Sequence, residues 1–353
     1  MSNHDPLVAP LGRDVDGRAR SSEAGTGRAL ASAVGLLTLA SCGPIASGVL
    51  HVRGLLGVEW TSSAYYQALV VQLIGACLTS SWLLWAVVAR TRLRPAYRWM
   101  QGTAAAMYGA IVVVAALPSM ATGLLGLTLA AGALAWLAIE VTRARGVPLN
   151  LDLGTWTRAA GTQRTWTVAG GTIAACAAGG GVMGISVMLL RVLDADSTVP
   201  VMAGGQLSGL GLGGAGDLML SVLCAVILED LVVVAAGSTL LAAARRPVWL
   251  IYTTICVIEV LLHAYVGVPA LAMALYGAGR VWLFRRYGLV TPMIIGHAAF
   301  DLLGGLLVSL PLRYRLLIAL PCIPAIHVAA RIKQRSAERS GSASSSQSGE
   351  FDA

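Results

Sequence analysis

The sequence predicts an all-α protein, a polytopic transmembrane helical bundle of about 8 to 10 spans. Hydrophobic residues make up 56% of the 353 residues, charged residues only 12%, and the mean hydropathy is +0.74. A typical soluble domain carries about 25% charged residues. Apolar stretches of about 20 residues, each long enough to cross ~30 Å of hydrocarbon as a helix, recur along the chain. These observations exclude an ordinary soluble domain.

Ten apolar stretches between charged breaks are the predicted spans. They cover about 29–50, 63–89, 99–117, 121–141, 166–190, 216–243, 248–266, 268–284, 289–311 and 314–330. Basic residues cluster at every second connection, so the positive-inside rule places both termini in the cytoplasm. We therefore expect a multi-pass protein of the cell membrane, with the lipid bilayer as its first partner. The net charge of +8 fits this topology and contact with anionic lipid, and we expect no nucleic-acid partner.

Composition divides the chain into four parts. Residues 1–28 and 331–353 are polar and are expected to be disordered cytoplasmic ends. Residues 29–204 form the N-terminal transmembrane helices, and their spans hold almost no ionisable side chains. Residues 205–330 hold nearly all of the intramembrane acids and histidines. We expect the function to lie in this last transmembrane part.

Several ionisable residues interrupt the apolar stretches of residues 205–330, among them Glu229, Asp230, His263, His297 and Asp301. An ionisable group at the bilayer centre costs about 2.5–3.5 kcal/mol even on the lenient insertion scale, so several in neighbouring spans need a compensating role. We interpret them as one buried polar site. A structural network of hydrogen bonds between helices is the alternative.

Helical spacing predicts how these side chains are directed. Glu229 and Asp230 are adjacent and point about 100° apart on an α-helix, so we expect only one of them to face the site. His297 and Asp301 are four residues apart on one face, close enough for both to touch a single water or substrate oxygen.

The residue types suit hydrolysis of a peptide bond. Glu229 would act as general base on a water, and a histidine or Asp301 would stabilise the oxyanion. Glu259, one turn before His263, is interpreted either as a partner that orients the imidazole of that histidine or raises its basicity, or as an incidental residue of the cavity. The same residues leave a metal mechanism open, because Glu229, His263 and His297 match the ligand count of a catalytic zinc site. The sequence does not choose between these mechanisms.

In order and spacing the residues resemble the CPBP intramembrane proteases, which include the type II CAAX prenyl endopeptidases and bacterial proteins linked to bacteriocin processing and self-immunity. The resemblance covers residues from about 216 to 311. The family motifs are Glu-Glu-x-x-x-Arg, Phe-x-x-x-His and His-x-x-x-Asn/Asp. The corresponding segments here are Glu229-Asp230-Leu-Val-Val-Val234, Glu259-Val-Leu-Leu-His263 and His297-Ala-Ala-Phe-Asp301.

The resemblance implies a catalytic role for four residues. Glu229 would activate the water together with His263, while His297 and Asp301 would form the oxyanion-stabilising pair. Asp230 would be the second acid of motif one and would contact the catalytic residues without touching the substrate. The substrate would be a peptide or a membrane-associated protein, cut by an intramembrane endopeptidase.

Two departures from the family pattern bear on activity, because Val234 replaces the motif-one arginine and Glu259 replaces the motif-two aromatic. Arg280, in the following span, is expected to extend toward the cytoplasmic boundary. Electrostatic compensation for the missing arginine, by Arg280 or by Glu259, is the alternative.

Two other functions stay open. A catalytically impaired relative acting as a binding or immunity protein fits Val234. A proton-coupled transporter would also bury acids and histidines, but the chain lacks the repeat symmetry of many transporters.

Overall fold

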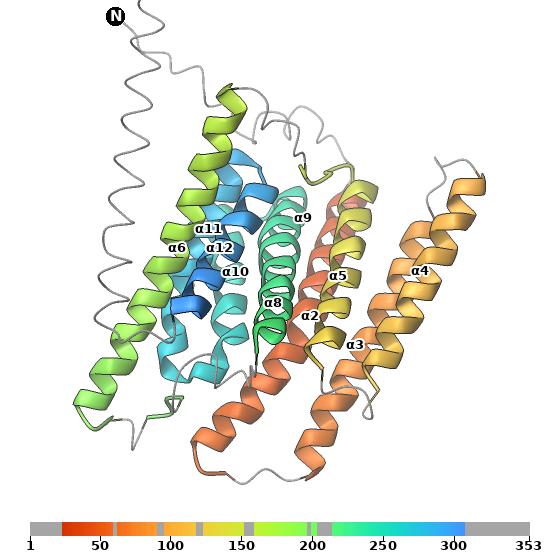
Figure 1. Ribbon diagram of the computed structural model, residues 1–353. Coiled ribbons are helices and arrows are strands. Elements are labelled where there is room, and N and C mark those ends of the chain that lie inside the picture. Colours follow the sequence, from red (N-terminus) through yellow and green to blue (C-terminus); the bar gives the residue numbers. More distant parts are fainter. Residues whose placement is uncertain are drawn as a thin grey trace, which may run out of the picture. The chain divides into compact units, whose positions relative to one another are not determined.

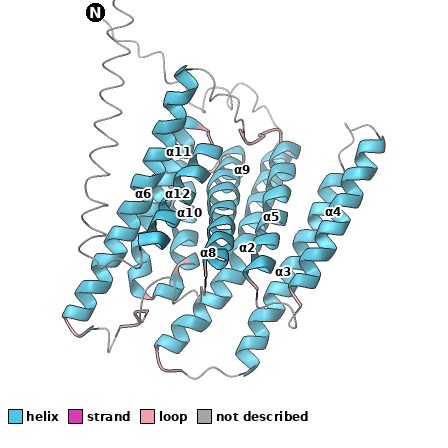
Figure 2. Ribbon diagram, viewed as in Figure 1, coloured by secondary structure: helices cyan, strands magenta, loops and turns pink. Residues whose placement is uncertain are grey.

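The computed structural model describes residues 23–58, 62–89, 95–117, 123–151, 159–195, 199–202 and 214–307 (Figure 1). Within these residues the regular elements are helices, joined by loops, with one isolated bridge between Val201 and Gly267 (Figure 2). The prediction of an all-α helical bundle is confirmed. The predicted span at 314–330 and both chain termini lie outside the described residues.

The described residues up to 195 form five helices, which follow the apolar stretches of the sequence. They are α2 (Glu23–Leu55), α3 (Ser62–Val88), α4 (Pro95–Ala115), α5 (Leu124–Ala144) and α6 (Ala159–Val192). Helix α3 packs against α2, α4 and α5. Between α4 and α5, the Tyr108 hydroxyl donates to the carbonyl of Leu129 at 2.8 Å. Small residues and hydroxyls at such contacts allow helices to approach closely in a membrane.

The next described segment is one continuous helix of changing winding. It comprises α8 (Ala215–Ala225), the π-helix η3 (Val226–Gly237) and α9 (Ser238–Ala243). Then follow α10 (Val248–Leu262), the short 3₁₀ helices η4 (Ala264–Val266) and η5 (Val268–Ala272), α11 (Met273–Tyr287) and α12 (Thr291–Leu307). Residues up to Leu302 form one compact unit, and those from Leu303 form another.

Five of the described helical segments are long and apolar enough to cross a membrane. They are Gly25–Leu55, Tyr66–Val88, Leu124–Ala144, Thr162–Val192 and Ala215–Ala243. Helices α10 and α12 are apolar but shorter. These helices fit the predicted membrane protein, although fewer described helices reach spanning length than the ten stretches suggested.

The turn after α10 explains why the apolar stretches at 248–266 and 268–284 do not form two full-length helices. Gly267 has a φ of +86°, which residues with a Cβ rarely adopt. The amide of Val268 donates to the carbonyl of Pro200 at 3.0 Å, and the amide of Met202 donates to that of Val266 at 3.1 Å. This turn ends α10 just before His263 and directs the chain into α11.

Helices α6 and α11 approach closely through small residues. A Cβ on Gly179 would lie 2.6 Å from the Cβ of Tyr276, and one on Gly279 would lie 2.7 Å from that of Ala175. Helix α6 therefore packs closely against α11. A helix from the part of the chain before residue 205 thus contacts the region where the ionisable residues gather.

Candidate functional site

Glu229 and Asp230 lie side by side on the π-helix η3, and both are buried. Both reach the same partner, because Arg280 Nη2 lies 3.3 Å from Glu229 Oε2 and Arg280 Nη1 lies 2.7 Å from Asp230 Oδ1. Both carboxylates therefore belong to the site, whereas the α-helical spacing predicted that one of them would look toward a neighbouring helix. The segment is a π-helix, which bonds residue i to i+5. That only one of the two is the working carboxylate stays a prediction.

Arg280, on α11, is fully buried and binds a third carboxylate. Its Nη2 lies 2.5 Å from Glu259 Oε1 on α10. The guanidinium carbon also lies 3.6 Å from the ring centre of Tyr276, a cation–π contact. The expectation that Arg280 extends toward the cytoplasmic boundary is therefore wrong, because its planar group of donors is held by carboxylates on two neighbouring helices.

Tyr276, one turn before Arg280 on α11, is the centre of the cluster. Its hydroxyl donates to Glu229 Oε2 at 2.9 Å and lies 2.5 Å from His297 Nε2. Because the single hydroxyl hydrogen goes to Glu229, we assign His297 Nε2 as a donor to the tyrosine oxygen. The Tyr276 ring meets the rings of His263 and His297 edge-on, with centroids 5.9 and 5.4 Å apart. Tyr276 thus links the two histidines to the carboxylate of Glu229.

His297, on α12, has a carboxylate at each ring nitrogen. Its Nδ1 lies 2.9 Å from Asp230 Oδ2, and its Nε2 lies 3.2 Å from Asp301 Oδ2 one turn further along the helix. An imidazolium can donate from both nitrogens at once, so this arrangement suits the charged ring. Asp230 therefore joins η3 to both α11 and α12.

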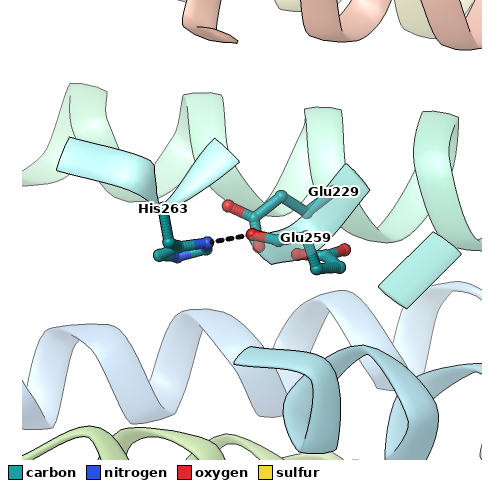
Figure 3. Close-up of side chains that lie close together, drawn as sticks. All are labelled: Glu229, Glu259 and His263. Carbon is teal, nitrogen blue, oxygen red and sulfur yellow. Dashed lines mark hydrogen bonds between the residues drawn. The ribbon is translucent and has the colours of Figure 1, made fainter. Parts of the chain in front are cut away.

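His263, the residue that ends α10, is oriented by the main chain. Its Nδ1 lies 2.9 Å from the carbonyl oxygen of Glu259 (Figure 3). Because a carbonyl only accepts, Nδ1 carries the hydrogen, and Nε2 of the neutral ring keeps its lone pair. The carboxylate of Glu259 turns to Arg280 instead, so the expected side-chain pairing is replaced by a main-chain one. Gly277 leaves room for the side chain of Glu259, since a Cβ at position 277 would lie 2.9 Å from Glu259 Cγ.

Three of these residues form the group of potential metal ligands among the described residues. Glu229, Glu259 and His263 each offer a ligand atom within 4.8 Å of the others. The set suggested by the sequence contained His297 in place of Glu259. His297 differs because both of its nitrogens already face carboxylates.

Burial across the site is graded. The side chains of Arg280, Asp230 and Glu259 are 0% exposed, that of Glu229 is 10% exposed and that of Asp301 is 30% exposed. Asp301 is therefore the most accessible of these acids, and Glu229 is the next.

The structure brings together all six residues singled out from the sequence, which come from η3, from α10 and its C-cap, and from α12. Tyr276 was not among the candidates. A signal for Arg280 was available in the sequence, because an arginine within an apolar stretch, next to spans with several acids, needs a buried partner. Tyr276 lies one turn before it on the same face, but a tyrosine in an apolar helix carries no comparable signal.

No protein-family model, curated protein or solved structure matches this chain.

Proposed function

We propose that this protein is an intramembrane peptide hydrolase of the CPBP type, and that Glu229 activates the attacking water. One observation carries the proposal, which is the position of Glu229 between two histidines. A carboxylate oxygen of Glu229 lies within 4.8 Å of a ring nitrogen of His263, and Glu229 Oε2 accepts the hydrogen bond from Tyr276 that continues to His297. A base flanked by groups that donate and accept protons suits acid–base catalysis.

The proposed reaction begins with a water between Glu229 Oε1 and the free Nε2 of His263. Glu229 takes a proton from the water as its oxygen attacks the carbonyl carbon of the peptide. The resulting oxyanion accepts a hydrogen bond from His297 Nε2, which exchanges the Tyr276 oxygen for the substrate. The C–N bond then breaks, and the amine leaves with the proton from Glu229.

Asp230 and Arg280 support this chemistry by fixing positions. Asp230 Oδ2 contacts Nδ1 of His297, and Arg280 contacts Glu229 Oε2 and Asp230 Oδ1. Arg280 thereby occupies the electrostatic place of the motif-one arginine, for which this chain has Val234. The absence of the motif-one arginine weakened the resemblance to the family. The guanidinium of Arg280, which lies on α11 and not on η3, supports it.

The second candidate is a binding or immunity protein that lost hydrolysis. The observation that favours it is the ion pair between Arg280 and Glu229, because a carboxylate engaged by a guanidinium is a weaker base. The candidates differ in one respect, whether Glu229 is needed for a chemical step.

The test is peptide cleavage by purified protein in lipid nanodiscs, with a peptide library incubated in ¹⁸O-labelled water. Hydrolysis places ¹⁸O in the new carboxyl group, which mass spectrometry detects. We expect cleavage by the wild type and by Glu140→Gln, a change to a buried acid on α5 outside the site. Glu229→Gln is expected to lower the rate at least ~100-fold. Equal rates for the two variants would contradict the proposal and favour the binding protein.

A further inference from the structure

Helices α3 and α4 line a cavity that the proposed reaction does not involve. Its volume of about 400 Å³ lies within the range of small-molecule sites. Figure 1 shows the two helices side by side, and the cavity lies between the end of α3 and the first half of α4. Its walls include Leu84 and Val88 of α3, and Arg98, Gly102, Thr103 and Ala106 of α4.

Arg98 is the charged residue that lines this otherwise largely apolar cavity. Its Nε is buried and has no hydrogen-bond partner among the residues that the structure describes. A buried donor without a partner is costly, and a guanidinium presents its donors in a fork that suits a phosphate or a carboxylate. The Arg98 end of the cavity therefore favours an anion.

The surrounding sequence supplies positive charge without an acid. Residues 60–139 contain four arginines, Arg90, Arg92, Arg94 and Arg98, but no aspartate or glutamate. Helix α4 also begins without an acid in its first turn, although the N-terminus of a helix favours negative charge. An anion from outside the chain would complement both features.

The aromatic residues at the start of α4 place Arg98 at the level of lipid headgroups. Tyr97 and Trp99 are 55% and 78% exposed, and both residue types gather at membrane–water interfaces. The distribution of arginines predicts that this end of α4 is cytoplasmic, where anionic lipids attract basic segments. Ala106 lies just over two turns after Arg98, about 12 Å further along the helix axis. A cationic end and an apolar end suit an amphipathic ligand better than a free anion.

We propose that this cavity binds one anionic phospholipid. The lipid phosphate accepts hydrogen bonds from the guanidinium of Arg98, and an acyl chain follows α4 past Thr103 and Ala106. The small side chains at these positions keep the apolar end of the cavity open. No residue of this cavity belongs to the site of the proposed function, so failure of either proposal leaves the other standing.

The experiment titrates the full-length protein, purified in detergent and delipidated, with phosphatidylglycerol or with phosphatidylcholine of identical acyl chains. Native mass spectrometry gives the dissociation constant of the first bound lipid. We expect the wild type to bind phosphatidylglycerol at least about fivefold more tightly, which is the contribution of one arginine near an anionic headgroup. Arg98→Gln is expected to lose this preference. The control Arg286→Gln, which changes an exposed arginine on α11, should keep it.

A second pair of variants tests the apolar end. Ala106→Leu narrows the cavity, so we expect it to weaken phosphatidylglycerol binding about fivefold or more. Ala104→Leu adds the same side chain to an exposed position of α4 that does not line the cavity, and it should bind like the wild type.

Elution as a single species in size exclusion identifies folded samples, and the wild type with its two lipids provides a test that needs no variant. Equal affinity of the wild type for the two lipids would overturn the site. An unchanged preference in folded Arg98→Gln, or unchanged affinity in folded Ala106→Leu, would overturn it as well. Displacement of the lipid by millimolar inorganic phosphate would identify a site for a free anion and defeat the phospholipid.

Discussion

Arg280 holds a single positive charge among three buried carboxylates, so the stability of the site depends on it. Replacing one partner of a buried ion pair costs about 3–5 kcal/mol, because the remaining charges stay buried without compensation. We expect Arg280→Met to lower the free energy of unfolding by about this amount. The thermal unfolding midpoint in detergent and the amount of protein in the membrane measure the effect.

The control is Arg286→Met, which removes an exposed arginine from the same helix. Its midpoint is expected to stay close to that of the wild type. Adding Glu259→Gln to Arg280→Met should recover part of the loss, because it removes one of the stranded charges. Equal midpoints for Arg280→Met and Arg286→Met would show that the ion pairs contribute little.

Tyr276 offers a change that separates chemistry from packing. Tyr276→Phe keeps the ring against Arg280 and removes only the hydroxyl between Glu229 and His297. If that hydroxyl orients the base, we expect cleavage to fall about 10- to 100-fold while membrane abundance stays normal. The ¹⁸O cleavage assay measures the rate. Unchanged cleavage would remove Tyr276 from the proposed reaction.

At the scale of single residues, the sequence predicted the membership of the site better than its contacts. Charged residues in apolar stretches are costly wherever they lie, so Glu229, His263 and His297 were identifiable from cost alone. The partners depend on distances between helices, which the sequence does not state. For that reason the guanidinium of Arg280 was expected near the membrane boundary, and Glu259 was expected to use its carboxylate on His263.

At the scale of elements, the π-helix η3 is the feature that the sequence could least reveal. Apart from Glu229 and Asp230, its residues, Val226–Gly237, have the composition of any buried apolar helix. In this π-helical segment Glu229 and Asp230 both contact Arg280.

The close contact of α6 with α11 predicts a graded pair of variants on one helix. A Cβ on Gly179 would collide with Tyr276, whereas Gly184 has no atom within 4 Å of the Cβ position. We expect Gly179→Ala to destabilise the protein by about 1–3 kcal/mol through overpacking and to displace Tyr276. Gly184→Ala should be neutral, or stabilising by about 0.5–1 kcal/mol, because alanine favours the helix.

Unfolding midpoints in detergent and cleavage rates test the pair. Loss of both stability and cleavage in Gly179→Ala alone supports a role for α6 in placing Tyr276. If both variants behave like the wild type, the two helices have room to separate, and α6 does not set the position of the tyrosine.

At the scale of the whole molecule, the fold class followed from composition, because 56% hydrophobic residues leave few alternatives to a helical bundle in a membrane. The number of spans was harder to predict. A hydropathy profile does not reveal the positive-φ turn at Gly267, which divides the apolar region 248–284 into shorter helices. Apolar stretches that all predicted a membrane span therefore correspond to helices of different length.

The predicted topology is testable by fusion reporters. The distribution of arginines predicts that both termini are cytoplasmic, so fluorescent protein fused to either end should fluoresce and alkaline phosphatase at the same positions should be inactive. Phosphatase fused within the connection at 203–213 is expected to be active. The opposite pattern would invert the topology, and activity at one terminus alone would mean an odd number of spans.

Because the acids differ in exposure, they should also differ in their reactivity toward a reagent that modifies carboxyl groups. A lipid-soluble carbodiimide entering from the Asp301 side would meet a carboxyl that is 30% exposed, then Glu229 at 10%, and would reach Asp230 and Glu259 last. A reporter group could therefore be attached to Asp301, the most exposed acid, while the fully buried acids stay unmodified. The order in which these carboxyls react would give a direct reading of the direction from which small molecules enter.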